Sequence, residues 1–350
     1  MTAKNVTYHI VGGGIAGLAC AKFVKKYDRK ARTVVYEAQG RIGGRCYSYE
    51  DKDLDRKLDN ATHVILGANK NAAALLGPQK WTEDCCFWNA RNGSISKNYK
   101  AMCNTQAELV PPSIIRKIVW KLFPWSRRQR KIYFSKQDLS PRIINPLLAY
   151  VDELQLNRKL VKIESQFGKA AQLDFADRQI EVGADDKVIL ALDSKAYNRL
   201  TGGEPFDYNG IINVFYRTSQ KLTLPEDASL MGIADGLADW IFINDDIVNV
   251  TISDSGQKDD DLDGLARKIW KQLDKLRGVN SGFVPPFKVI NHKIATIRQD
   301  AANNNKRPKN AKTVYPNVFI AGDWTMKNYP CSLETAILSA KRAVKTARKS

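Results

Sequence analysis

Three glycines near the start of the chain, Gly12, Gly14 and Gly17, are spaced as G-x-G-x-x-G. They follow an apolar run over residues 8–11 that is typical of a buried parallel strand. In such a turn the first glycine permits the tight bend, the second lets backbone approach a pyrophosphate, and the third lets the following helix pack closely. Glu37 ends the next apolar run about 20 residues later, where an acid hydrogen-bonds ribose hydroxyls. The spacing predicts a dinucleotide-binding site.

A second glycine pair follows directly, in the segment Glu37-Ala38-Gln39-Gly40-Arg41-Ile42-Gly43-Gly44-Arg45. Gly43 and Gly44 let another stretch of backbone lie against the ligand. Arg41 and Arg45 can place guanidinium groups beside a diphosphate. The segment, with Ala38 included, resembles the E-A-x-x-R-x-G-G-R signature of FAD-dependent amine oxidases, phytoene desaturases and their relatives. That resemblance implies FAD as the cofactor.

Gly322 and Asp323, near the other end of the chain, end a third apolar run. Gly322 leaves room at the carboxyl end of this strand, where ligands bind in open α/β sheets. Asp323 can accept hydrogen bonds from ribitol hydroxyls. The predicted helix that follows, 332–348, starts with Leu333 near the flavin pyrimidine carbonyls and directs its positive end at them. The helix after Gly14, which opens with Ile15 and Ala16, directs its amides at the phosphates in the same way.

These elements predict an α/β chain with a Rossmann-like FAD-binding domain and an interleaved, smaller α+β substrate domain. We expect the FAD-binding domain to comprise 1–70, 155–200 and 285–350, and the substrate or cap domain to comprise 71–154 and 201–284. Strands expected at 159–164, 171–175, 179–182 and 187–192 are assigned to one antiparallel set. A helix is expected over 261–276 from its apolar stripe, and a loop over the Asn- and Lys-rich residues 301–312.

The chain resembles, within this superfamily, the squalene-associated branch, the hydroxysqualene dehydroxylases. Residues 58–68, read as LDNATHVILGA, look like that branch's L-D-N-G-Q-H-x-x-L-G-A, and residues 321–337 resemble its A-G-D-W-T…P-x-x-I-E-G-A-V. The resemblance implies hydride transfer at flavin N5 to or from a carbon of an apolar, isoprenoid-like substrate, for this branch the reductive removal of an allylic hydroxyl. It also places the Val161 backbone beside the adenine.

The same resemblance suggests catalytic candidates. Loss of hydroxide needs a proton donor, and His63 is the first candidate because histidine can hold a proton near neutral pH. A structural histidine bonded to backbone is an equally good interpretation. Asn60 and Tyr329 are weaker candidates for positioning the substrate.

Several departures leave alternatives open. Ala61 and Thr335 stand where the branch has glycine, and the middle of the chain is shorter than expected, as in renalase-like flavoproteins. Ser332 occupies the place of an aromatic cage residue of monoamine oxidases, which argues against amine oxidation. An oxidase of a small polar molecule, and a flavoprotein that acts on or with a partner protein, remain the alternative functions.

Residues 113–134 combine an apolar stripe at helical spacing with tryptophans and the basic cluster Arg127, Arg128, Arg130 and Lys131. The pattern fits contact with an anionic membrane surface. A lid helix over the substrate site, with a solvated basic face, explains it equally well.

Composition sets further bounds. The net charge of +18 favours an anionic surface as partner, but no nucleic-acid motif is present. The six cysteines and three histidines show no metal-site spacing, so we expect no metal and a reducing, cytoplasmic location with peripheral membrane contact as an option. No signal peptide or apolar run of transmembrane length is recognised, and without a second G-x-G-x-x-G no resident NAD(P)H domain is expected.

Overall fold

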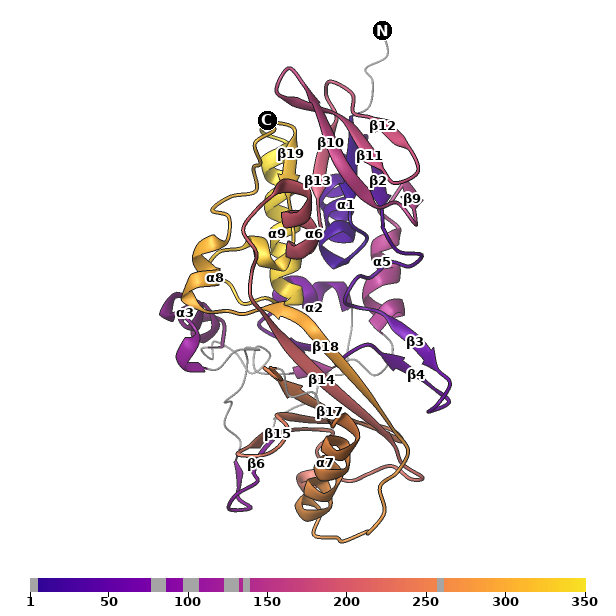
Figure 1. Cartoon of the computed structure of the whole chain (residues 1–350), viewed down its shortest axis with the longest axis vertical. Coiled ribbons are helices and arrows are strands. Elements are labelled where there is room, and N and C mark those ends of the chain that lie inside the picture. Colours follow the sequence, from indigo (N-terminus) through magenta and orange to yellow (C-terminus); the bar gives the residue numbers. More distant parts are fainter. Residues whose placement is uncertain (1–5, 77–85, 97–106, 123–131, 135–138, 257–260) are drawn as a thin grey trace.

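The structure is a computed structural model that describes residues 6–76, 86–96, 107–122, 132–134, 139–256 and 261–350 (Figure 1). Its upper half is built on a five-stranded parallel sheet of order β19-β13-β1-β2-β9. The strands are β1 (Thr7–Val11), β2 (Arg32–Tyr36), β9 (Glu153–Gln155), β13 (Lys187–Leu190) and β19 (Val318–Ile320). The predicted Rossmann-like α/β fold is thereby confirmed.

Two helices cover one face of this sheet. Helix α1 (Ile15–Tyr27) follows β1, and α9 (Leu333–Ala347) returns from the far end of the chain to pack beside α1 (Figure 1). Side chains of both helices share one core with the sheet, including Ile10, Leu18 and Val344. Burial of β1 and β2 on both faces explains their unbroken apolar sequences.

A three-stranded antiparallel sheet covers the other face. It contains β10 (Leu160–Gln166), β11 (Lys169–Phe175) and β12 (Gln179–Glu181), and its Leu173 and Phe175 pack against Val34 and Tyr36. The prediction that residues 187–192 join this antiparallel set is wrong. Strand β13 lies instead between β1 and β19, because Val188, Ile189 and Leu190 are all buried, as a central parallel strand requires.

The lower half contains a seven-stranded sheet of order β18-β14-β17-β16-β15-β6-β7. Its strands are β6 (Cys86–Asn89), β7 (Ile95–Ser96), β14 (Tyr208–Arg217), β15 (Leu230–Ala234), β16 (Trp240–Asn244), β17 (Ile247–Ser253) and β18 (Phe287–Ile297). Helix α7 (Leu262–Leu276) packs on one face through Ala266, Ile269 and Leu273, which confirms the helix predicted over 261–276.

The predicted domain boundaries remain a proposal, with two adjustments. The boundary at 154 assigns 139–154 to the cap domain, whereas Ile143 and Leu147 share the core of α1 and β9 pairs with β2 in the parallel sheet. The boundary at residue 285 assigns 287–297 to the FAD-binding domain, whereas β18 pairs with β14 in the seven-stranded sheet. The predicted loop over 301–312 is also partly wrong, because α8 (Ala301–Lys306) forms there. Asp300 caps this helix by accepting a hydrogen bond from the Asn303 amide.

Smaller elements connect the two halves. The hairpin β3 (Ser48–Asp51) and β4 (Arg56–Asp59) and the pair β5 (Val64–Leu66) and β8 (Ile132–Phe134) lie between the large sheets. The helices are α2 (Lys70–Leu76), α3 (Pro112–Leu122), α5 (Asn145–Leu148) and α6 (Ser194–Thr201), with single turns η1 (Ala107–Leu109), η2 (Ser140–Ile144), η3 (Pro225–Asp227) and η4 (Asp323–Thr325). Among the described residues, none of the helices has the length and apolar character that crossing a membrane requires.

Candidate functional site

The turn between β1 and α1 is held closed by glycine. Gly12 has φ +114°, and a Cβ there would lie 2.4 Å from the Ala191 carbonyl oxygen, so only glycine fits. A Cβ on Gly17 would lie 1.8 Å from the Gly12 carbonyl oxygen, so α1 can approach β1 only with glycine at this position. These contacts agree with the tight bend and the close helix packing expected at the two glycines, and their part in cofactor binding remains a prediction.

Gly14 differs from Gly12 and Gly17 because neither its backbone conformation nor the protein atoms around it require glycine. Its φ of −75° and ψ of 178° suit any residue, and the nearest described atom to an added Cβ is the Gly44 Cα, 3.9 Å away. Gly14 also caps α1, whose first turn contains no acidic residue. An open space in front of unpaired helix amides is what a pyrophosphate occupies in this turn. Ile15 and Ala16, the first residues of α1, are buried beneath it.

Glu37, which follows the end of β2, stabilises this turn through hydrogen bonds. Its carboxylate accepts hydrogen bonds from the Gly13 amide at 2.7 Å and the Gln39 amide at 2.9 Å. Each carboxylate oxygen can accept a second bond, so Glu37 retains capacity for ribose hydroxyls. The Arg158 amide donates to the Glu37 carbonyl at 2.7 Å, which brings the segment before β10 alongside. Val161, 52 % exposed at a register shift in β10, lies three residues further on.

The second glycine loop lies against the first. Gly43 pairs with Gly14 in an isolated parallel bridge, and its amide donates to the Gly13 carbonyl at 2.9 Å. Gly43 has φ +100°, and a Cβ on it would lie 2.2 Å from the Cys46 carbonyl oxygen. Arg41 stacks on the Tyr47 ring, 3.4 Å from its centroid, and donates to the Gly44 carbonyl at 3.1 Å. Arg41 therefore stiffens the loop, while Ala38 is exposed at its start.

Arg45 and Asp323 join the signatures at the two ends of the chain. Arg45 Nη2 donates to Asp323 Oδ1 at 2.7 Å, and its Nη1 donates to the Ala295 carbonyl of β18 at 2.8 Å. The Asp323 carboxylate raises the pKa of the Arg45 guanidinium, which stays charged. The side chain of Arg45 is half exposed, while Asp323 is 7 % exposed. The pair presents a fixed cation at the edge of the glycine loops.

The start of α9 is fixed by two polar contacts. Gly322 has φ +138°, and its amide donates to Ser339 Oγ at 2.8 Å. Ser332 caps the helix by accepting from the Thr335 amide at 3.2 Å, and Leu333 packs against the core below. The structure thus gathers the predicted cofactor residues from both chain ends at the carboxyl edge of the parallel sheet.

His63 lies next to the Arg45 loop, with its Nδ1 4.0 Å from Cys46 Sγ. Burial is the main cause that lowers the pKa of His63 to about 4; a hydrogen bond to the Arg45 backbone opposes it, and the Arg45 charge adds to it. The imidazole is therefore neutral near pH 7. This runs against the expectation that His63 holds a proton there, and favours the structural interpretation of this side chain.

The two positioning candidates also make structural contacts. Asn60 is buried, accepts a hydrogen bond from the Tyr47 amide at 3.3 Å, and receives one at its carbonyl from His292. Tyr329 accepts a hydrogen bond at its carbonyl from Arg307, and its ring lies 4.9 Å below Lys117 of α3. Their catalytic roles remain predictions.

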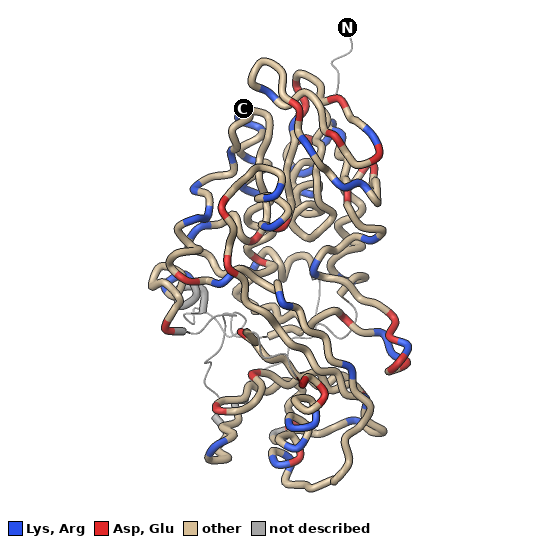
Figure 2. Tube along the Cα trace, viewed as in Figure 1, with Lys and Arg blue, Asp and Glu red and all other residues tan. Residues whose placement is uncertain are grey.

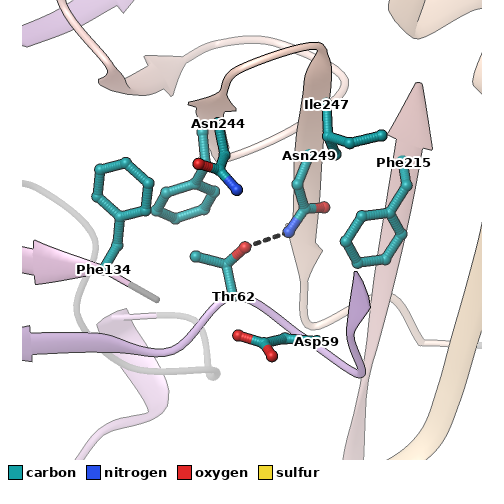
Figure 3. A pocket seen from close by; sticks show the side chains of 8 residues that line it. Asp59, Thr62, Phe134, Phe215, Asn244, Ile247 and Asn249 are labelled. Atoms are coloured by element: carbon teal, nitrogen blue, oxygen red, sulfur yellow. Dashed lines mark hydrogen bonds between the residues drawn. The ribbon is translucent and has the colours of Figure 1, made fainter. Parts of the chain in front are cut away.

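A small cavity lies between residues 59–62 and the seven-stranded sheet (Figure 3). Its volume is about 10 Å³, which is at the lower limit of the space that can hold one water molecule. Asp59, Thr62, Asn244 and Asn249 face it, with the rings of Phe134 and Phe215 at its sides. Four polar groups therefore converge on a space that is otherwise apolar.

Two family models match the chain. One, described as an NAD(P)-binding Rossmann-like domain, matches residues 10–77, which contain both glycine loops. The other, described as flavin containing amine oxidoreductase, matches residues 149–347, more than half of the chain. The chain belongs to the flavin-containing amine oxidoreductase family. It is accordingly a flavin-dependent oxidoreductase.

Individual relatives place this family member more narrowly. The chain is 27% identical to a hydroxysqualene dehydroxylase of Zymomonas mobilis, covering 96% of this chain and 97% of the relative. A hydroxysqualene dehydroxylase of Sinorhizobium fredii is 24% identical, covering 97% of each chain. These matches confirm the resemblance to the squalene-associated branch. Both alignments run over 414 positions, more than the 350 residues here, so they contain gaps in this chain.

A solved structure shows the same fold. An oxidoreductase from Methanosarcina mazei superposes with a TM-score of 0.68 at 12% identity, covering 99% of this chain and 100% of the other. The residues described above fit a flavin dinucleotide, because the open space at Gly14 and the helix amides suit its phosphates. Asp323 stands where a hydroxylated linker can be bound.

Sequence reasoning missed several residues of this flavin-dependent oxidoreductase. Glu334, buried in α9, accepts hydrogen bonds from the Asn71 side chain and from the Asn71 and Ala72 amides, and so caps α2. Arg307, 2 % exposed, donates to the carbonyls of Met326 and Tyr329 and fixes the loop before α9. No local sequence pattern predicts hydrogen bonds between residues that are so far apart in the chain.

Asn249 was missed for a different reason. It alternates along β17 with valines that pack under α7, a period-two pattern that predicts a solvent-facing polar side. In the folded chain Asn249 is only 3 % exposed, because residues 59–62 cover that side. The alternation of polar and apolar residues in this strand is visible in the sequence. Whether its polar side faces solvent or a buried cavity depends on which residues cover the sheet.

Proposed function

We propose that the chain binds FAD and transfers a hydride between flavin N5 and a carbon centre of an apolar, isoprenoid-like substrate, as a hydroxysqualene dehydroxylase or desaturase-like enzyme. The proposed substrate class rests on the near full-length similarity to curated hydroxysqualene dehydroxylases. The proposed dinucleotide rests on the open space at Gly14, where the protein's own packing does not require glycine.

In this proposal each end of the cofactor has its own set of residues. Gly12, Gly14 and Gly17 lie at the pyrophosphate with the first amides of α1. Glu37 accepts from the adenosine ribose, and the Val161 backbone lies at the adenine. Arg45 neutralises phosphate charge, and Asp323 accepts from the ribitol hydroxyls.

When bound in its reduced form, the flavin supplies a hydride, and the net conversion R–OH + FADH₂ → R–H + H₂O + FAD balances in atoms and electrons. The protein must bind the apolar chain, exclude water and assist the departing oxygen. The low pKa of His63 favours a neutral imidazole, which can orient the substrate or accept a hydrogen bond from it. If His63 nonetheless delivers the proton, its loss costs about 10²–10⁴-fold in rate while the flavin stays bound.

A single-turnover experiment tests the redox proposal. The flavin of purified protein is reduced anaerobically, mixed with a hydroxylated isoprenoid, and followed by the return of oxidised-flavin absorbance and by the hydrocarbon product. His63→Ala is compared with wild type in the same assay. Reoxidation by the lipid supports the proposal. Turnover of an amine or a dihydronicotinamide, with no response to any such lipid, replaces it with an oxidase of a small polar substrate, which the family's amine oxidoreductase description favours.

We also propose that residues 113–134 contact an anionic membrane surface, as a peripheral cytoplasmic enzyme of a lipid substrate requires. Only part of this segment is described. Ile114 of α3 is fully buried and Ile115 is 41 % exposed, so the apolar residues do not all face outward. Ser113 bonds to Asn328, which supports the lid alternative for the start of the helix. The basic cluster 127–131 lies outside the described residues.

A further inference from the structure

The seven-stranded sheet has two chemically different faces. Ile212 and Val214 of β14, and Val248 and Val250 of β17, pack under α7 in an apolar core. The residues that alternate with them lie on the opposite face and include Asn213, Asn249 and Thr251. This second face points toward residues 59–62 and the flavin-binding half (Figures 1 and 3).

Two amides on this face are buried with one end unused. Asn249 meets Thr62 Oγ1 through Nδ2, and its Oδ1 has no hydrogen-bond partner among the described residues. Asn213 accepts from Thr251 Oγ1 at 2.8 Å, and its Nδ2 likewise has no described partner. Turning either amide over exchanges oxygen for nitrogen and still leaves one end unmet. Buried polar groups in proteins are almost always paired, so each unused amide end is a place for a bound water or a ligand group.

The two amides are neighbours. Asn213 lies opposite Thr251 in the β14–β17 register, which makes it the diagonal neighbour of Asn249, about 7–8 Å away between Cα atoms. Asn249 faces the small cavity, whose volume of about 10 Å³ admits one water-sized group. Thr62, at the same cavity, directly precedes His63 beside the Arg45 loop. The cavity is therefore joined to the cofactor site through one short segment.

We propose that this cavity is the subsite for the substrate's hydroxyl group, with Asn249 and Thr62 as its hydrogen-bonding residues. The inference rests on the proposed function and names the group that the site recognises. A single oxygen fits the volume, and the polar wall next to phenylalanine rings suits one hydroxyl on an apolar chain. Asn249 and Thr62 would hold this oxygen as the C–O electron pair leaves with it. A bound reduced flavin would supply the hydride for the carbon and the proton that converts the departing hydroxide to water, so the atoms and electrons balance.

Binding to the oxidised flavoprotein tests the subsite separately from redox chemistry. The probes are farnesol and the hydrocarbon that lacks only its hydroxyl, titrated against the visible flavin spectrum. We expect wild type to bind farnesol about tenfold more tightly than the hydrocarbon, since the alcohol satisfies the unused amide end. In Asn249→Leu the ratio should fall to about one, with hydrocarbon affinity within about twofold of wild type.

Asn291→Leu is the matched control, because Asn291 lies opposite Ile212 on the other face of the same sheet and should leave the ratio unchanged. If Asn249→Leu does not fold, Thr62→Val removes the second polar group at constant shape and should give the same loss. A wild-type ratio of one, or an unchanged ratio in the cavity variants, overturns the inference and makes the cavity a structural water site. Failure of the proposed function shows differently, as reduced wild-type flavin that no isoprenoid alcohol reoxidises.

Discussion

At the scale of single residues, glycine is needed at Gly14 and Gly17 for different physical reasons. A side chain at Gly17 would collide with the backbone of the preceding turn, so the fold demands glycine there. A Cβ at Gly14 would lie 3.9 Å from its nearest described neighbour, which is ordinary van der Waals contact, so the need for glycine comes from what binds in front of it. Sequence spacing identifies both glycines, but the two reasons differ only in the packing around each glycine in the folded chain.

This distinction predicts opposite outcomes for two substitutions. Gly14→Val should fold with near wild-type stability and purify without flavin, because the branched side chain fills the pyrophosphate space. Gly17→Ala should lose about 1–3 kcal/mol or more of folding free energy, because α1 must move away from β1. Urea unfolding and extraction of the released flavin measure both properties. Yellow, FAD-loaded Gly14→Val protein would contradict this account of the turn.

The buried His63 predicts a stability change with pH. Its pKa is lowered from 6.5 to about 4 on folding, mainly by burial, so between these values the unfolded chain binds more protons than the folded one. The contribution of His63 is therefore fully present above pH 6.5 and is lost as pH falls toward 4.

The size of this contribution is roughly 2 kcal/mol, allowing for partial solvent access. His63→Gln removes the titration, so the difference in unfolding free energy between wild type and variant should shrink from pH 7 to pH 4.5. Chemical denaturation at both pH values measures it. A difference that stays constant across this range would show that His63 is not neutral and buried in solution.

At the scale of elements, sequence patterns identified the elements whose partners are local or whose motif is explicit. The strand–helix–strand unit around Gly12 and the helices over 261–276 and 332–348 were predicted because periodicity and spacing suffice. Residues 187–192 were misassigned because a buried parallel strand and a sheet-edge strand can share the same few apolar residues. The parallel partners of β13 lie far away in sequence, at β1 and β19, and no local pattern reveals them.

The basic cluster after α3 carries a prediction of its own. Basic residues occur over both halves of the molecule (Figure 2), so net charge alone does not locate an anionic contact. If residues 113–134 form it, changing Arg127, Arg128 and Arg130 to Glu should weaken binding to anionic vesicles at low salt. Three lost contacts at ~1 kcal/mol each correspond to a loss of at least about 100-fold.

A matched charge change separates this segment from the other basic surface. Lys341, Lys345 and Lys349 line a groove beside the C-terminal end of α9, and their replacement by Glu alters net charge by the same amount. Flotation with phosphatidylserine vesicles compares the two triple variants. Equal losses would show a general charge effect, and loss in the α9 variant alone would move the contact to that groove.

At the scale of the whole molecule, the site is assembled from segments that are distant in sequence. Arg45 and Asp323 are 278 positions apart and form a hydrogen-bonded ion pair at 2.7 Å, while Glu334 of α9 caps α2 across a similar separation. Motifs at both chain ends predicted the members of this site. Their contacts, and the burial of Asn249 beneath residues 59–62, arise only from the packing of two sheets that the sequence does not encode locally.

This assembly predicts that the cofactor and the fold are thermodynamically coupled. A dinucleotide that spans the β1–α1 turn, the Gly43 loop and the start of α9 binds only when both chain ends are in place, so it stabilises the folded chain by mass action. At FAD concentrations of 100 times Kd the gain is about 2.7 kcal/mol, or roughly 4 °C in Tm for a chain of this size. Thermal unfolding of flavin-stripped protein across an FAD series measures it.

FMN, which lacks the adenosine that Glu37 and Val161 are proposed to bind, should give a much smaller shift, and Gly14→Val should respond to neither. An equal shift with FMN would mean that the glycine-rich turn does not bind a dinucleotide, because the adenosine half would then contribute nothing to the stability of the complex.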